Sequence, residues 1–187
     1  MLLFHVHFEV DDVPAVETEL ERNGFALLAR FAYVGRDVRR FEPDEPLDGA
    51  RLRLSELEQG AVNIVLMPSR FPERRLGHFG FTAEPSEHAA VLDRAAELGL
   101  RSQPDAVRSF VELDRQLRLE ISDAARHGYT DEHLAVLRIE QLEVACANPA
   151  EAADRLRRLV GPELAAQVRF RQGRERFAQL AEWTLAP

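Results

Sequence analysis

Three strand-like segments of the sequence carry side chains that bind divalent metals in proteins. His5 and His7 alternate with apolar residues near the start of the chain, His78 opens a second alternating segment, and Glu120 lies in a third. Because successive side chains of a strand point to opposite faces, these residues share the face that the apolar residues leave free. Neutral imidazole and carboxylate groups suit iron(II), manganese, nickel or zinc, and three protein ligands leave positions for substrate and water. The pattern therefore predicts a divalent metal site.

The segments that position these side chains belong to an internal repeat. Residues 4–25, 77–100 and 141–161 each begin with period-two alternation and continue as an amphipathic run. Each predicted strand is followed by a helix-start residue and each helix ends at a glycine, in the pairs Asp12 and Gly24, Pro85 and Gly99, and Asn148 and Gly161. The repeat predicts three strand–helix units.

Further strands are expected between these units. They cover 25–34, 50–57, 61–67, 106–113, 116–122, 165–171 and 175–185, whereas the charged segment 35–49 is expected to form a long loop. The predicted fold class is α+β, with paired βαβββ modules (about 1–72 and 73–122) that form a curved mixed sheet around a cleft. One strand of the second module stays unassigned. A connector (123–134) leads to a partial third βαββ module (135–187) without metal ligands.

This organisation over residues 4–122 resembles the vicinal oxygen chelate superfamily, which includes glyoxalases, bleomycin resistance proteins and extradiol dioxygenases. The family pattern places a metal histidine in the first strand seven residues before an aspartate, which here matches His5 and Asp12. The resemblance assigns the second histidine to His78 and the glutamate of the last strand to Glu120. It therefore implies His5, His78 and Glu120 as the metal ligands.

The sequence departs from the family pattern in three places. The Asp-Pro-x-Gly turn before the glutamate is missing, and Leu113 to Gln116 stand there instead. Val65 occupies the place where glyoxalase-like members carry a fourth ligand, and Gln141 replaces the histidine in the third unit. The remaining two histidines and one glutamate resemble the facial triad of the dioxygenase branch.

Other polar residues are candidates for acid/base work or for structure. His7 could act in catalysis, or be the ligand itself if the strand register differs. His127, Tyr129 and His133 fall in the connector, where they could contact substrate or belong to a plain loop. His88 is expected to be a solvated residue of the second helix. Cys146 alternates with Val144 and is expected to belong to the core.

Three functions fit this pattern. The first is an Fe(II)- or Mn(II)-dependent oxygenase, with zinc or nickel as alternative metals, acting on a small substrate that chelates the metal through adjacent oxygens, such as a catechol or an α-keto acid. The second is a non-redox epimerase, isomerase or lyase, with Asn63 or Glu9 in the fourth ligand position. The third is a metal-free protein that binds an antibiotic or natural product against aromatic residues such as Phe31, Tyr33 and Phe41.

Composition restricts the partners. The 187 residues include 32 acidic and 24 basic side chains, a net charge of −8 that disfavours nucleic acid. All basic residues are arginine, which excludes lysine chemistry, and no apolar run is long enough for a membrane span. The single cysteine and the absence of a leader pattern indicate a cytoplasmic protein, and the arginine bias indicates a bacterial genome. The unfinished third module would leave an open strand edge that favours a homodimer.

Overall fold

The computed structural model describes residues 1–173 and 178–186. The chain alternates strands with short helices in the order that the repeat predicts. The elements are β1 (Leu2–Val10), α1 (Val13–Arg22), β2 (Ala26–Val34), β3 (Asp37–Phe41), β4 (Arg51–Gln59), β5 (Val62–Pro68), β6 (Arg75–Ala83), α2 (Pro85–Glu97), β7 (Ser102–Gln103), β8 (Arg108–Asp114), β9 (Leu117–Asp123), α3 (Ala124–His127), α4 (Asp131–Val136), β10 (Arg138–Cys146), α5 (Pro149–Val160), α6 (Pro162–Ala165), β11 (Val168–Gln172) and β12 (Gln179–Ala186).

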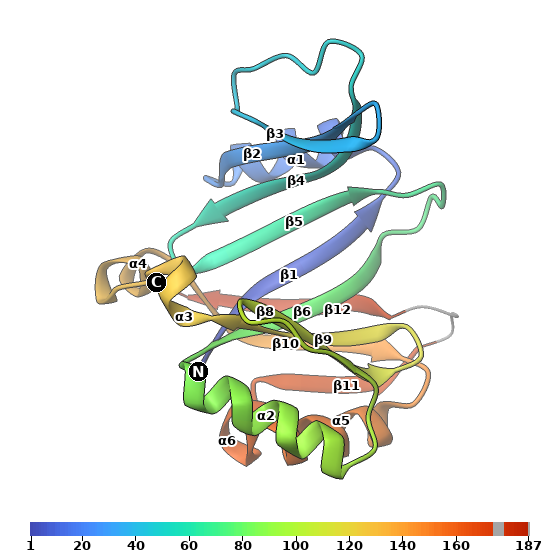
Figure 1. Ribbon diagram of the computed structural model, residues 1–187, viewed down its shortest axis with the longest axis vertical. Coiled ribbons are helices and arrows are strands. Elements are labelled where there is room, and N and C mark those ends of the chain that lie inside the picture. Colours follow the sequence, from blue (N-terminus) through green and yellow to red (C-terminus); the bar gives the residue numbers. More distant parts are fainter. Residues whose placement is uncertain (174–177, 187) are drawn as a thin grey trace.

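The strands form two sheets, which confirms the predicted α+β class (Figure 1). The larger sheet has nine strands in the order β3-β2-β4-β5-β1-β6-β9-β8-β7, and the smaller has three in the order β11-β10-β12. Within the larger sheet, β1 runs parallel to β5 and antiparallel to β6, so the sheet is mixed. Side chains from strands as far apart in the sheet as β2 and β8 line one shared cavity, so the sheet is curved and open.

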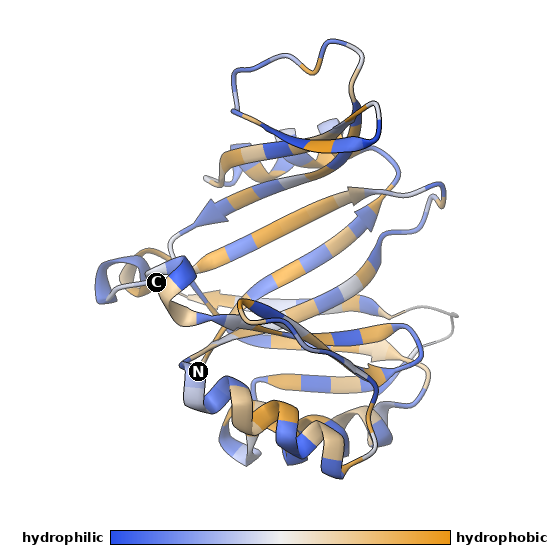
Figure 2. Ribbon diagram, in the orientation of Figure 1, coloured by the Kyte–Doolittle hydropathy of each residue, from blue (hydrophilic) through white to orange (hydrophobic). Residues whose placement is uncertain are grey.

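One face of the larger sheet is covered and apolar. Helix α1 packs on β2, β4 and β5, helix α2 packs on β6 and β9, and between them the smaller sheet contacts the sheet centre through β10 and β12. The alternation of hydrophobic and hydrophilic residues along β1 and β5 is visible in Figure 2. Val6, Ile64 and Phe79 are completely buried on this covered face, called the back face below. Their burial supplies the apolar core that holds the strands together.

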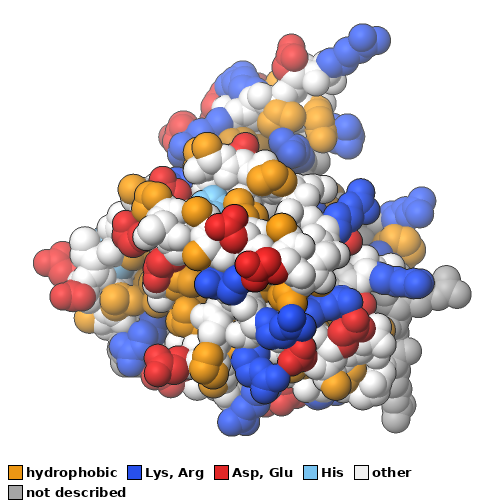
Figure 3. Space-filling view, turned by 60° about the horizontal axis from the view of Figure 1, so that its bottom comes forward, with side chains coloured by type: hydrophobic (Ala, Val, Ile, Leu, Met, Phe, Trp, Pro, Cys, Tyr) orange, Lys and Arg blue, Asp and Glu red, His pale blue; other side chains and the backbone are white. Residues whose placement is uncertain are grey.

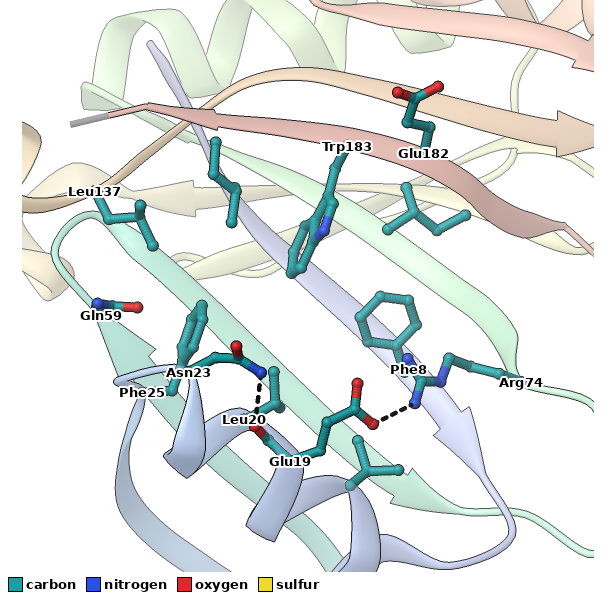
Figure 4. Close-up of a pocket in the computed structure, with 13 residues that line it drawn as sticks. Phe8, Glu19, Leu20, Asn23, Phe25, Gln59, Arg74, Leu137, Glu182 and Trp183 are labelled. Carbon is teal, nitrogen blue, oxygen red and sulfur yellow. Dashed lines mark hydrogen bonds and ion pairs between the residues drawn. The ribbon is translucent and has the colours of Figure 1, made fainter.

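The back face retains a cavity of about 570 Å³ between α1 and β12 (Figure 4). Phe8 and Trp183 both line this cavity, with their ring centroids 6.3 Å apart in an edge-on arrangement. A 3.5 Å ion pair between Arg74 and Glu19 lies near Phe8. The walls carry apolar side chains and no histidine among the residues that the structure describes there.

The central strands β1 and β6 repeat one local irregularity. The pairing of β1 with β6 shifts register twice. The first shift lies between Leu3 and His5 and leaves Phe4 of β1 as an extra residue. The second lies between His7 and Phe8 and leaves Gly77 of β6 as an extra residue. Each extra residue directly precedes a histidine, His5 or His78. A β-bulge changes the direction of the side chains beside it. The two repeats thus present their histidines in the same local setting.

Several sequence predictions need correction. The segment 35–49 is not one loop, because 37–41 form β3, an edge strand whose backbone pairs with β2 and whose charged side chains stay in solvent. The unassigned strand of the second module is the short β7, and the connector contains α3 and α4. His88 is not solvated: its ring is buried and its Nε2 lies 2.8 Å from the Ser109 hydroxyl.

The ends of the other predicted elements differ by a few residues. Strand β11 begins after the short helix α6, which the sequence did not predict. The predicted strand 175–185 partly lies outside the described residues, and β12 is observed over Gln179–Ala186. Cys146 is buried as predicted. No helix within the described residues is long and apolar enough to cross a membrane.

Candidate metal centre

Three buried ligand groups from three neighbouring strands meet on the concave face of the larger sheet. His5 of β1, His78 of β6 and Glu120 of β9 are 4%, 4% and 3% exposed, and their ligand atoms all lie within 4.8 Å of one another. The Nε2 atoms of the two histidines are 3.1 Å apart. Glu120 Oε2 lies 3.0 Å from His78 Nε2 and 3.8 Å from His5 Nε2.

These separations suit atoms that share one ion. Two atoms bound to the same ion at about 2.1 Å and at right angles lie roughly 3 Å apart. Glu120 Oε2 is fully buried and has no hydrogen-bond partner among the described residues. A buried carboxylate oxygen without a donor is costly unless a cation or donor compensates it. The three groups therefore fit a divalent cation.

The orientation of His5 is fixed by a chain of hydrogen bonds. The Asn63 side-chain amide donates to Glu56 Oε1 over 3.0 Å, so its oxygen faces His5. His5 Nδ1 lies 2.7 Å from that oxygen and must carry the proton that it donates. In the tautomer with the proton on Nδ1, the lone pair lies on Nε2, which points to the cluster. Such a carbonyl or carboxylate partner behind a histidine is typical of metal ligands.

Burial keeps the neighbouring imidazoles neutral. Desolvation, followed by the charges of His5 and two arginines, holds the pKa of His78 well below its ordinary value. Desolvation, with the charges of His78 and His5, lowers the pKa of His7 from 6.5 to about 2. Neutral imidazole is the form that binds metals or accepts a proton.

The cluster lies in a cavity of about 350 Å³ with both aromatic and cationic walls. The aromatic walls are Phe4, Phe31 and Phe110, and the rings of His78 and Phe110 meet edge-on with centroids 5.1 Å apart. The arginines that line it are Arg53 of β4, Arg108 of β8, Arg118 of β9 and Arg126 of α3. This cavity is called the cleft below. It offers an apolar slot and a cationic rim around the ligand atoms.

The candidates for acid/base catalysis differ in whether they line the cleft. His7 lines the cleft, with its ring centroid 4.4 Å from that of His78 and its Nε2 without a hydrogen-bond partner among described residues. His127 also lines the cleft, where its Nε2 lies 3.0 Å from the Ser122 hydroxyl, and burial lowers its pKa to about 4. Tyr129 does not line the cleft: its hydroxyl donates to Glu58 Oε2 over 2.9 Å. His133 is exposed on α4.

The residues considered for a fourth ligand position do not join the cluster. Val65 lines the cleft and offers no ligand atom. Asn63 contacts Nδ1 of His5, on the side of the ring away from the cluster. Glu9 lies farther along β1, 4.0 Å from Arg75. Phe31 lines the cleft as predicted, whereas Tyr33 and Phe41 line a different surface depression.

Some cleft residues escaped the sequence analysis. Phe4 would face the back by simple alternation, but the bulge turns it into the cleft, where its ring packs on His127 with centroids 4.4 Å apart. Glu56, Arg53, Arg108 and Arg118 come from strands and Arg126 from α3, and they meet in one cavity because the sheet curves. The sequence signal for Arg118 is parity: it alternates with Leu117 and Leu119 as Glu120 does, and both residues line the cleft.

Comparisons with known proteins identify the fold. No protein-family model matches the sequence, and no curated protein is found as a relative. Among solved structures, the chain is similar to a triple variant of 4-hydroxymandelate synthase from Streptomyces coelicolor (TM-score 0.57, 14% identity, 84% of this chain and 51% of that one). It is also similar to an extradiol ring-cleaving dioxygenase from B. fuscum (TM-score 0.53, 14% identity, covering 85% of this chain and 44% of that one). A third similar structure is the Mn(II)-bound glyoxalase from Novosphingobium aromaticivorans (TM-score 0.54, 14% identity, covering 86% of this chain and 52% of that one).

These structures share the vicinal oxygen chelate fold, and the present chain has that fold. The chain spans about half the length of the solved structures it matches, or less. Identities this low establish the fold and leave the reaction open. The resemblance inferred from the sequence is therefore confirmed at the level of fold.

Proposed function

We propose that the chain is a metal-dependent enzyme of the dioxygenase type, with His5, His78 and Glu120 as the metal ligands. The metal of choice is Fe(II) or Mn(II), with zinc or nickel as alternatives, and the substrate is a small molecule that chelates the metal through two adjacent oxygens. The observation that carries this proposal is the meeting of three buried ligand groups around a carboxylate oxygen without a hydrogen-bond partner. Two of the similar structures bear the names of a dioxygenase and an Mn(II)-bound glyoxalase, which supports the choice.

A bound divalent ion would lower the pKa of a chelating substrate hydroxyl and hold its two oxygens. The chain's own residues would do the rest. His7 has an unpartnered Nε2 beside His78, so it is placed to take the proton that a bound substrate hydroxyl loses and to return the same proton to the product. His127 faces the cleft from the connector with its Nε2 beside the Ser122 hydroxyl, so it is the alternative group for this proton. Phe4 and Phe110 would hold an aromatic or planar substrate and exclude water from the site.

The test begins with metal content. Protein purified without chelators should contain a divalent metal, and the metal-stripped protein should bind one Mn(II) per chain in a calorimetric titration. His78→Ala and Glu120→Gln should each abolish tight binding, because each removes one of only three ligands. The matched control is His133→Ala on exposed α4, which should bind Mn(II) as the parent does. Normal Mn(II) binding by Glu120→Gln would refute the assignment of this residue.

Turnover is the second step. The protein is loaded with Fe(II) without oxygen, mixed with catechols or α-keto acids, and then given oxygen while its uptake is recorded. Oxygen uptake that His78→Ala lacks and His133→Ala keeps would support the oxygenase. Oxygen-independent turnover, supported equally by cobalt or nickel, would replace it with a non-redox isomerase or lyase.

A metal-free binding protein is the second candidate, because aromatic rings and arginines line the cleft independently of any metal. This function predicts that chelator-treated and untreated protein bind an aromatic ligand equally well. It also predicts that His78→Ala keeps this affinity. Tight Mn(II) binding together with metal-dependent turnover would exclude it.

A further inference from the structure

Four arginine side chains surround the candidate metal ligands without any acidic partner of their own. Arg53, Arg108, Arg118 and Arg126 come from four different elements and line the same cleft. Among residues 1–173 and 178–186, the side chains of these four take part in no ion pair or hydrogen bond. Arg53, Arg108 and Arg126 are exposed and Arg118 is half-buried, so their guanidinium groups are accessible to an anion that enters the cleft.

Arginines without an ion pair among the described residues also occur outside the cleft, for example Arg22 and Arg36, so the distinctive feature of these four is that they gather in one cavity. The 32 acidic side chains of the chain outnumber its 24 basic ones. Elsewhere they are used: Arg30 binds Glu17 at 2.7 Å, and Arg171 binds Glu143 at 2.8 Å. On the face shown in Figure 3, acidic and basic side chains are interspersed. The lining of the cleft departs from this pattern, because it contains four arginines and only two carboxylates, those of Glu56 and Glu120.

The two carboxylates of the cleft are already engaged. Glu56 accepts a hydrogen bond from Asn63, and Glu120 belongs to the candidate metal ligands. The cross-strand neighbour of Arg118 is Glu112, which pairs instead with Arg101 at 3.6 Å. Arg118 also borders a depression lined by Glu9 and Glu112, but it forms an ion pair with neither among the described residues.

An aromatic ring positions two of the arginines beside the metal ligands. The guanidinium carbons of Arg118 and Arg108 lie 4.9 Å and 5.4 Å from the centre of the Phe110 ring. The same ring meets His78 edge-on, with centroids 5.1 Å apart. Cation–π contact restrains both guanidinium groups next to the cluster. Two like charges at one ring repel each other unless an anion lies between them or nearby.

We propose that the cleft selects a substrate with an oxyanion group, a carboxylate or a phosphate, which Arg118 and Arg108 bind. This inference deepens the proposed function and rests on it for the placement of the substrate's chelating oxygens at His5, His78 and Glu120. Guanidinium groups bind both oxyanions through paired, charge-assisted hydrogen bonds. Phe110 separates the anion-binding end from the metal-binding end. Arg53 and Arg126 would attract the anion from the rim of the cleft.

The probes isolate the charge of the ligand. Protocatechuate and its methyl ester share the two adjacent hydroxyls and differ in the carboxylate. Each is titrated calorimetrically into metal-free and Mn(II)-loaded protein. The acid should bind at least about tenfold more tightly than the ester, because only the carboxylate can accept charge-assisted hydrogen bonds from the arginines. Benzoate and phenyl phosphate, titrated in parallel, show which oxyanion is preferred.

Variants then locate the effect. Arg118→Gln and Arg108→Gln should each weaken acid binding about tenfold and leave ester binding unchanged. The matched control is Arg36→Gln, which makes the same charge change in the exposed turn after β2, away from the cleft lining. Equal affinity for acid and ester, or an equal loss in Arg36→Gln, would overturn the inference.

The two proposals can fail separately. If metal-free protein prefers the acid in an Arg118-dependent way but binds no Mn(II), the anion site stands and the metal-dependent function falls. If the protein binds Mn(II) and turns over neutral chelators without preferring the acid, the function stands and the anion site falls.

Discussion

The two faces of the nine-stranded sheet differ most clearly at two adjacent residues of β6. His78 points into the cleft, where its Nδ1 has no hydrogen-bond partner among the described residues, whereas Phe79 is completely buried on the back face. Phe79 packs near Phe81 and near Phe170 of the smaller sheet, with centroids 6.3 Å and 6.4 Å away. The back face gains stability from apolar burial, while the cleft holds polar groups that cost stability. Alternation along β6 thus places an apolar core residue on one face of the sheet and a candidate metal ligand on the other.

The largest expected effect tests this division directly. Phe79→Ala should lower the free energy of unfolding by about 3–5 kcal/mol, because it removes a large buried ring and leaves a cavity. His78→Ala, one residue away, should change the stability of the metal-free protein far less, because it removes a buried polar group without a full set of partners. Urea unfolding of metal-free protein measures both.

Metal binding should show the opposite order. Folded Phe79→Ala should still bind Mn(II), whereas His78→Ala should not. If His78→Ala proved as destabilising as Phe79→Ala in the absence of metal, the cleft face would also be a packing surface and the comparison would fail.

An intermediate effect concerns pH. Burial lowers the pKa of His127 from 6.5 to about 4, so between these values the unfolded chain binds a proton that the folded chain does not. Stability rises with pH wherever the unfolded state binds more protons, so this residue makes the protein less stable as the pH falls through that window. In His127→Gln the free energy of unfolding should therefore fall less steeply as the pH is lowered. The difference in slope should correspond to less than one proton taken up on unfolding.

The back face provides the control for this prediction. Phe8→Leu alters a buried apolar side chain, so it should shift the free energy of unfolding by a similar amount at every pH. Urea unfolding of both variants between about pH 7 and about pH 5 distinguishes a change of slope from a uniform shift. An unchanged slope in His127→Gln would show that this histidine is solvated in the folded protein.

The same alternation explains how much the sequence could predict. Val6, Phe8 and Val10 identify the covered face of β1, and parity then places His5 and His7 opposite, as observed. The meeting of His5 with His78 followed from their matching places in the repeat. Local patterns were sufficient here because both histidines lie on adjacent central strands.

Prediction failed where a contact depends on tertiary geometry. Phe4 reverses its expected face because of a bulge that alternation does not reveal. The charged β3 looks like a loop because an edge strand requires backbone pairing with β2 but few apolar residues. His88 looks solvated until Ser109 of another element supplies its buried partner. Arg53 and Arg126 meet in the cleft only because the sheet curves.

The smallest effect is expected at the back-face cavity, where Arg74 and Glu19 form their ion pair near Phe8 (Figure 4). Both side chains are about half exposed, at 48% and 60%, and their closest atoms are 3.5 Å apart. Exposed pairs of this kind contribute about 0–1 kcal/mol, so Arg74→Gln should change the free energy of unfolding by no more than that and leave Mn(II) binding unchanged. Urea unfolding and calorimetric titration of the same protein measure both quantities. A loss as large as that of Phe79→Ala, or any loss of Mn(II) affinity, would contradict this expectation and would mean that the back-face cavity and the cleft are coupled.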